Sequence, residues 1–264
     1  MMEFCVLASG SKGNCTYVSS GGTAVLIDLG LSARDTVTRL NEAGIPPVGI
    51  HAILFSHDHT DHFRGIEVFS KKFPAVRLLA NEGTASGIDH TFPKTRLNWE
   101  IFETATAFDI GALRIEAFSL PHDASDAVGF TISDGQSCLG IMTDFGYASP
   151  LVHNKLSKCD ALILESNHDY DMLMASNRPW TLKTRIAGRS GHLSNEAAAD
   201  LLKTAAPPRL RLLLLAHLSE ECNTPKLAHD TMRRTLVSMR RPDITLDVLH
   251  QDKISVRFNV GQAL

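Results

Sequence analysis

Short apolar runs recur along most of the chain, and turn-forming residues separate them. Such runs are too short for helices and are typical of strands buried in a sheet. The runs that we interpret as strands are Glu3–Ala8, Cys15–Ser19, Ala24–Asp28, Ala52–Phe55, Arg77–Ala80, Leu113–Ser119, Val128–Ser133, Cys138–Thr143, Ala161–Glu165, Leu210–Ala216, Thr245–Leu249 and Ile254–Phe258. Other segments space their apolar residues as helices do. The predicted helices are one that Ser32 caps and that runs through Leu40 to end near Gly44, then Phe63–Phe73, Pro150–Ser157, Asn195–Thr204 and Pro225–Met239.

The order of these elements predicts the fold class. Strands that resemble hairpins come early in the chain, and later strands alternate with helices. Two sheets packed face to face with helices outside them accommodate both patterns. We therefore expect an α/β (α+β) protein built as a four-layer αββα sandwich. No Ser/Gly-rich tract, charge block or low-complexity segment divides the sequence, so we expect residues 1–264 to form a single domain.

Composition indicates the compartment and says little about activity. Hydrophobic residues make up 44% of the chain and charged residues 21%, as in ordinary soluble proteins, and the net charge of −3 neither favours nor excludes a nucleic-acid partner. The five cysteines are scattered without a C-x-x-C pair, which indicates reduced thiols. Apolar runs such as Leu212–Ala216 are far too short to span a membrane, and the N-terminus lacks the pattern of a signal peptide. We expect a cytoplasmic protein with no membrane partner.

The most informative polar motif is His57-Asp58-His59-Thr60-Asp61-His62, which directly follows the predicted strand Ala52–Phe55. Its first two histidines can point from the loop at the strand end, while its second aspartate and last histidine open the next helix. Imidazole and carboxylate together suit zinc, manganese or iron, and two groups of ligands this close suit two divalent metal ions. A surface loop that is merely rich in histidine is the weaker interpretation of so dense a motif.

Three further polar residues stand where an apolar strand ends. His122 follows the strand Leu113–Ser119, and Asp144 and His217 directly follow two later strands. Taken singly, each is compatible with a loop histidine or a helix-capping aspartate. Together with the first motif, they supply the ligands that a two-metal site still needs.

The order H-x-H-x-D-H, then His, then Asp, then His resembles the metallo-β-lactamase-fold hydrolases. The resemblance implies one metal held by His57, His59 and His122, a second held by Asp61, His62 and His217, and Asp144 bridging both. It also implies a shared water whose pKa the metal pair lowers, giving a hydroxide nucleophile at neutral pH.

Further motifs resemble one branch of that fold, the YycJ/WalJ group of exonucleases, which is related to the tRNA-3′-processing nucleases. The match runs from the N-terminal strand to about Pro225. The matching motifs are Ser9–Asn14, Ile27–Gly30, Glu165–Asp169, Gly191–Asn195 and Ala216–Ser219. The resemblance implies a metal-dependent phosphodiesterase, with DNA as substrate and a 5′-to-3′ polarity.

The same resemblance implies an acid for the leaving group. Glu165 would orient and charge His192, and His192 would donate a proton to the leaving oxygen, so that Asp61, Glu165 and His192 form the catalytic set. The chemistry agrees, because a phosphodiester leaving group develops negative charge that a cationic imidazole stabilises. The alternative is a purely structural hydrogen bond between Glu165 and His192.

Other residues are candidates for binding the substrate. The loop Ser9–Asn14 can present backbone N–H groups to a phosphate, with Ser11 and Asn14 as side-chain donors, or can serve only as a hairpin turn. His168 either contacts phosphate or caps the following helix. The segment 172–195 has no acidic residue, and we expect its cations to bind a polyanion unless it is only a solvated loop with Trp180 docked on the core. Its candidate cations are Lys183, Arg185 and Arg189, together with Arg178.

The leading hypothesis is therefore a nuclease that acts on DNA and uses two divalent metal ions. Zinc or manganese is expected, and iron is also compatible. An RNA-processing nuclease is the close alternative, followed by a hydrolase of small esters, thioesters or lactones. A flavo-diiron reductase is disfavoured because His59 stands where that family has glutamate. A non-catalytic relative is disfavoured because all seven expected ligands are present.

Overall fold

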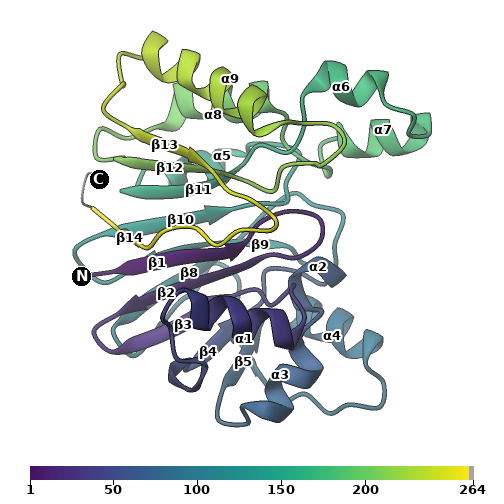
Figure 1. Ribbon diagram of the computed structural model, residues 1–264, viewed down its shortest axis with the longest axis vertical. Coiled ribbons are helices and arrows are strands. Elements are labelled where there is room, and N and C mark those ends of the chain that lie inside the picture. Colours follow the sequence, from purple (N-terminus) through teal and green to yellow (C-terminus); the bar gives the residue numbers. More distant parts are fainter. Residues whose placement is uncertain (262–264) are drawn as a thin grey trace.

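The computed structural model describes residues 1–261 and has the four-layer αββα architecture that the order of elements predicts (Figure 1). Two seven-stranded sheets pack face to face, in the orders β14-β1-β2-β3-β4-β5-β6 and β13-β12-β11-β10-β9-β8-β7. Helices cover the outer face of each sheet, so each half of the sandwich has its own helical layer (Figure 1).

The first sheet comes almost entirely from the N-terminal part of the chain. Its strands are β1 (Glu3–Ala8), β2 (Cys15–Ser20), β3 (Thr23–Ile27), β4 (Ala52–Leu54), β5 (Arg77–Ala80), β6 (Trp99–Ile101) and the short β14 (Phe258–Asn259). β1 to β3 pair antiparallel, and β3 to β6 pair parallel. The helical elements of this half are α1 (Ala33–Glu42), the 3₁₀ turn η1 (Pro47–Gly49), α2 (Thr60–Phe63), α3 (Ile66–Lys72) and α4 (Glu82–Thr91).

The second sheet has the same change of direction. Its strands are β7 (Ala107–Ile110), β8 (Leu113–Ser119), β9 (Val128–Ser133), β10 (Cys138–Met142), β11 (Ala161–Glu165), β12 (Leu212–Ala216) and β13 (Thr245–Val248). β7 to β10 pair antiparallel, and β10 to β13 pair parallel. The helices are α5 (Pro150–Leu156), α6 (Tyr170–Ala175), α7 (Trp180–Ile186), α8 (Asn195–Ala205) and α9 (Pro225–Ser238).

The two-residue period of the strands divides the core into layers. In β3, Val25 and Ile27 pack between the sheets, whereas Leu26 packs under the helices of the first half together with Leu40 and Phe69. A separate cluster fills the space between the second sheet and α5, α8 and α9. Strands buried on both faces need apolar residues at every position, which explains why the runs in the sequence are continuous.

The structure corrects two predicted elements. The predicted helix Phe63–Phe73 is divided into α2 and α3, because the chain turns at Gly65, whose N–H donates to Leu29 O. The predicted strand Ile254–Phe258 is not a strand before Phe258. There the Ser255 hydroxyl accepts from the Val6 N–H at 2.9 Å and so replaces a regular ladder contact.

The sequence pattern did not predict α4, α6, α7, β6 or β7. These elements bury few apolar residues: within α6 only Leu173 is buried, and within α7 only Lys183 and Ile186. A helix or short strand with so little apolar surface lacks the periodicity that identifies it in a sequence. Within residues 1–261, no helix combines the length and the hydropathy that a membrane span requires.

Candidate metal centre and active site

The predicted metal ligands meet at one edge of the sandwich. β8, β10, β11 and β12 all end at this edge of the second sheet, and β4 ends at the matching edge of the first. The residues just beyond those strand ends therefore come together, as they do at the carboxyl edge of other α/β sheets.

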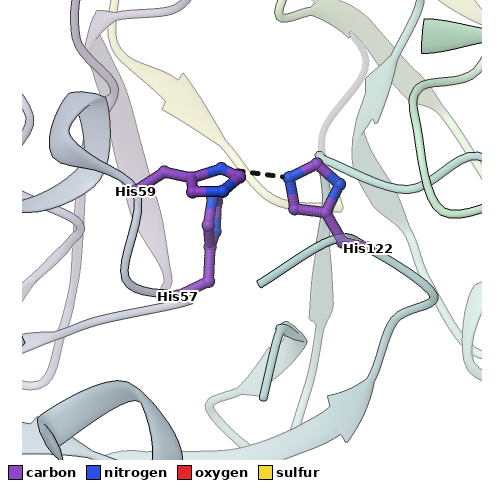
Figure 2. Close-up of side chains that lie close together, drawn as sticks. All are labelled: His57, His59 and His122. Carbon is purple, nitrogen blue, oxygen red and sulfur yellow. Dashed lines mark hydrogen bonds between the residues drawn. The ribbon is translucent and has the colours of Figure 1, made fainter. Parts of the chain in front are cut away.

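The three histidines of the first predicted set face one another (Figure 2). His59 Nδ1 lies 3.2 Å from His122 Nε2, and the rings of His57 and His59 are 4.7 Å apart. One ring nitrogen from each of the three histidines lies within 4.8 Å of the others. A cation bound between the rings would satisfy one lone pair from each histidine.

Neighbouring polar groups fix two of these rings. His57 Nδ1 lies 3.0 Å from the Ser56 hydroxyl, and His122 Nδ1 lies 3.1 Å from the Gly191 carbonyl oxygen. A ring nitrogen that donates to such a partner leaves the opposite nitrogen, Nε2, as the free ligand. Burial lowers the pKa of His57 well below its usual value, which keeps the ring neutral.

The second predicted set lies beside the first. His62 Nε2 lies 3.7 Å from Asp61 Oδ2, and His217 Nε2 lies 3.5 Å from the same oxygen. Asp144 stands between the two sets, with Oδ2 at 3.4 Å from His62 Nε2 and Oδ1 at 3.3 Å from His217 Nδ1. In addition, one potential ligand atom from each of Asp144, His57 and His62 lies within 4.8 Å of the others.

Buried atoms without partners test whether these residues fit metal ions. Among residues 1–261, His57 Nε2, Asp144 Oδ2 and His217 Nε2 are buried and have no hydrogen-bond partner within the protein. Such atoms are costly to bury unless a ligand satisfies them. The cluster is therefore suited to metal binding, and its nitrogen and oxygen donors suit zinc, manganese or iron.

Asp28 is a supporting residue to which sequence reasoning gave no role. Its carboxylate accepts from the Ser56 N–H at 2.8 Å and the Ser56 hydroxyl at 2.9 Å, and it lies 2.8 Å from His62 Nδ1. Burial lowers the pKa of His62, but Asp28 and the other nearby carboxylates outweigh it and raise the pKa to about 9. Asp28 directly follows β3, so the rule that located Asp144 also applied to it.

Backbone strain is concentrated at the same edge. Asp28 and Asp144 have φ of 62°, and His217 has φ of 55°, in a region that residues other than glycine rarely adopt. Each of these residues turns the chain sharply as a strand ends. Gly30 permits a close approach of two loops, because a Cβ there would lie 1.6 Å from the Asp61 carbonyl oxygen.

Glu165 and His192 form the predicted pair. His192 Nδ1 lies 2.7 Å from Glu165 Oε1, while Glu165 Oε2 accepts from the N–H groups of Phe145 and Leu193. Burial alone lowers the pKa of His192, but the Glu165 carboxylate outweighs it and raises the pKa above the usual value. Glu165 Oε1 also lies 3.2 Å from His217 Nδ1, so this carboxylate connects the pair to the ligand cluster.

The two candidate phosphate-binding side chains of the loop Ser9–Asn14 lie in different environments. Ser11 lines the cavity above the cluster, whereas Asn14 is buried. Asn14 Nδ2 donates to the Gly10 carbonyl and lies 3.1 Å from His62 Nε2. Asn14 therefore contacts the same ring nitrogen of His62 that faces Asp61 and Asp144, and it is not among the residues that line the cavity.

His168 is buried and does not cap the following helix. The cap of α6 is Asp169, whose side chain accepts from the Met172 N–H at 2.8 Å. Burial lowers the pKa of His168 to about 4, and its buried Nδ1 has no partner in the described part of the chain. The ring is not among the residues that line the cavity.

The basic residues of segment 172–195 have different environments. Arg178 and Arg185 line the cavity, whereas Lys183 is buried and donates to the Met174 carbonyl. Arg189 stacks on the Tyr147 ring, with its guanidinium carbon 3.8 Å from the ring centre. Trp180 is 68% exposed, so it is not docked on the core.

The cavity has a volume of about 270 Å³ and opens over the ligand cluster. The cluster and the pair form its floor through Asp61, Asp144, His192 and His217. One cavity therefore brings together a cluster suited to metal binding, an imidazole paired with a carboxylate, and the partly exposed carboxylate of Asp61.

Comparison with known proteins agrees with this geometry. Residues 23–217 match the family model described as beta-lactamase superfamily domain. The chain is 31% identical over 236 residues to exodeoxyribonuclease YycJ of Bacillus anthracis, covering 89% of each chain. It is 33% identical over 233 residues to exodeoxyribonuclease WalJ of Streptococcus pneumoniae, covering 87% of this chain and 86% of the relative. The crystal structure of the metallo-beta-lactamase fold protein YhfI from Bacillus subtilis shares the fold, with a TM-score of 0.72 at 17% identity, and covers 97% of this chain and 99% of that one.

Proposed function

The chain belongs to the beta-lactamase superfamily, and we propose that it is a two-metal phosphodiesterase that degrades DNA from the 5′ end. The observation that carries the proposal is the Glu165–His192 pair beside the ligand cluster, 2.7 Å from Oε1 to Nδ1. Such an acid suits a nuclease because the leaving oxygen of a phosphodiester develops negative charge that a proton donor stabilises. The named activity of the YycJ and WalJ relatives supports DNA as the substrate.

We assign the metal ligands as the sequence suggested. One ion would be held by His57, His59 and His122, the other by Asp61, His62 and His217, with Asp144 between them. Two bound ions, zinc or manganese with iron also compatible, would supply Lewis acidity and a water of lowered pKa.

The side chains of the protein complete the reaction. Glu165 holds Nδ1 of His192, so the opposite nitrogen, Nε2, delivers the proton to the leaving oxygen of the scissile phosphodiester. Asp61 lines the cavity and orients the attacking water through its carboxylate. Because the assigned ligands come from the loops of both sheets, we also propose that the whole chain works as one domain. We further propose that it works in the cytoplasm, with nucleic acid as its partner.

The test separates the acid from the ligands. Metal content and turnover of end-labelled single-stranded and duplex DNA are measured for wild type, His192→Ala and Asp144→Ala, with the exposed His90→Ala as control. We expect His192→Ala to retain both metals and lose about 10²- to 10⁴-fold in turnover, the usual contribution of a positioned acid. Asp144→Ala should lose metal as well. Equal metal loss in the two variants contradicts the assigned roles, since His192 would then be needed for metal binding as Asp144 is.

The same assay distinguishes the alternative activities. Cleavage of RNA in preference to DNA indicates an RNA-processing nuclease that uses the same site. Hydrolysis of a small ester that survives His192→Ala, without cleavage of any nucleic acid, indicates the small-substrate hydrolase. The label that is released first gives the polarity.

A further inference from the structure

We infer that two arginines at the opening of the cavity, Arg178 and Arg185, bind two phosphates of a single DNA strand. In the free protein they pair with Glu221 and Asp123, and the phosphates replace these carboxylates when DNA binds. We call the first two the rim arginines and the last two the rim acids. The inference rests on the proposed function and adds to it how the strand is held above the metal centre.

The position of the rim arginines is the first argument. Both line the cavity together with His192 and Asp144. Arg185 belongs to α7, and Arg178 lies in the turn between α6 and α7. These two helices project from the helical layer at one end of the molecule (Figure 1). A strand whose phosphodiester reaches His192 therefore passes beneath this projection.

The rim acids belong to the loops that carry metal ligands. Asp123 directly follows His122, and Glu221 lies in the loop that follows β12 and His217. Arg178 Nε donates to Glu221 Oε2 at 3.0 Å, and Arg185 Nε donates to Asp123 Oδ2. Each ion pair thus joins the segment of α6 and α7 to one side of the candidate metal centre. Each also places a carboxylate oxygen near the path that we infer for the DNA strand.

The manner of pairing distinguishes the rim arginines from structural ones. Arg209 donates to Asp160 through two nitrogens, and Arg241 donates through three nitrogens to backbone carbonyls and to Asp243. Among residues 1–261, Arg178 and Arg185 each donate to an acceptor through Nε alone. Guanidinium carries five N–H donors, so most of the donors of each rim arginine remain available to a ligand.

The energetics favour exchange. One side chain of each pair is exposed, Arg185 at 61% and Glu221 at 68%, and its partner is partly exposed, Asp123 at 28% and Arg178 at 27%. Ion pairs that water reaches contribute little to stability. Phosphate oxygens accept two parallel N–H groups from one guanidinium, which a single Nε contact to a carboxylate does not match. A strand brings several phosphates at once, so it competes successfully with the two rim acids. In the free enzyme, the carboxylates of the rim acids thus occupy the positions that phosphate groups take when DNA binds.

The inference predicts an unusual direction of effect for an acidic residue. We measure binding of the metal-loaded protein to a fluorescent single-stranded oligonucleotide with cleavage-resistant linkages, across a salt series. Glu221→Gln should bind about two- to fivefold more tightly, because one competing ion pair is gone. Arg178→Gln and Arg185→Gln should bind more weakly, each reducing the slope of log K against log salt by about 0.7.

The matched control is Glu100→Gln, which makes the same change of charge in the exposed Arg77–Glu100 pair at the edge of the first sheet. It should leave binding unchanged. If the wild type degrades single-stranded DNA but Glu221→Gln binds no better than Glu100→Gln, the exchange is overturned and the proposed function stands. If the wild type neither binds nor degrades nucleic acid, the proposed function fails and the inference fails with it.

Discussion

The floor and the rim of the cavity are built in opposite ways. Floor side chains such as Asp144 and His217 are buried, and groups from several loops surround each of them. Rim side chains such as Arg185 and Glu221 are largely exposed, and within residues 1–261 each makes a single ion pair. The difference indicates that strand ends and buried contacts hold the candidate ligands in place, while the side chains that we propose as substrate contacts are held by few neighbours.

This contrast has a physical reason. A metal ion and a general acid need positions fixed to a fraction of an ångström, which only packed and hydrogen-bonded side chains supply. A flexible strand of varying sequence is held mainly through its phosphates, by charges that adapt to it. We therefore expect changes in the floor to abolish turnover or metal binding, and changes in the rim to alter binding by smaller factors.

The largest effect is expected from Gly30→Ala, which changes no functional group. The new Cβ would lie 1.6 Å from the Asp61 carbonyl oxygen, so the segment that carries Asp61 and His62 must move. We expect a loss of at least about a hundredfold in metal affinity, the upper range for residues that support ligands, and no detectable turnover. Metal titration and nuclease assays test this. The control is Gly49→Ala, where the nearest atom to a Cβ is 3.6 Å away, and normal metal binding by Gly30→Ala contradicts the prediction.

An intermediate effect is expected from Glu165→Gln, which removes the charge beside His192. The carboxylate raises the pKa of His192 despite burial, so its loss lowers that pKa. Because the acid form exists only below this pKa, the alkaline limb of the rate profile should move to lower pH. Turnover at neutral pH should fall about 10²-fold or more. A pH–rate profile beside the exposed Glu103→Gln tests this, and an unmoved alkaline limb is evidence for a structural role alone.

The smallest effect is expected from Trp180→Ala, at the first residue of α7, the helix that carries the rim residue Arg185. An indole that is 68% exposed offers its face to a base, and an exposed stack of this kind contributes at the lower end of base–aromatic stacking. We expect KM for single-stranded DNA to rise about fivefold with kcat unchanged. The control is Val48→Ala, a residue that is 81% exposed on η1. A fall in kcat at constant KM places Trp180 with the floor instead of the rim.

Much of the floor was predictable because its signals are local. The motif from His57 to His62 lies within six residues, and His122, Asp144 and His217 each follow an apolar strand. The strand runs themselves predicted the two-sheet sandwich. Glu165 and His192 were found through resemblance to a family, since no local pattern joins residues so far apart in sequence.

The rim and the supporting residues were less predictable. The basic segment was evident, but the sequence did not indicate that Lys183 donates to Met174 while Arg185 faces the cavity. Asn14 was a candidate phosphate donor, and the sequence did not indicate that its amide lies 3.1 Å from His62 Nε2. The directions of these side chains depend on neighbours that come from distant parts of the chain.

The sequence by itself determined the candidate ligands, the strands that carry them and the layered fold, because apolar periodicity and strand-end residues act over a few positions. Only the tertiary structure decided that Asp28 holds His62, that Glu165 contacts both His192 and His217, and that each rim arginine pairs with an acid of a ligand loop. Those contacts arise when the two sheets pack and bring strand ends together. Packing of this kind depends on the whole chain, and no short segment encodes it.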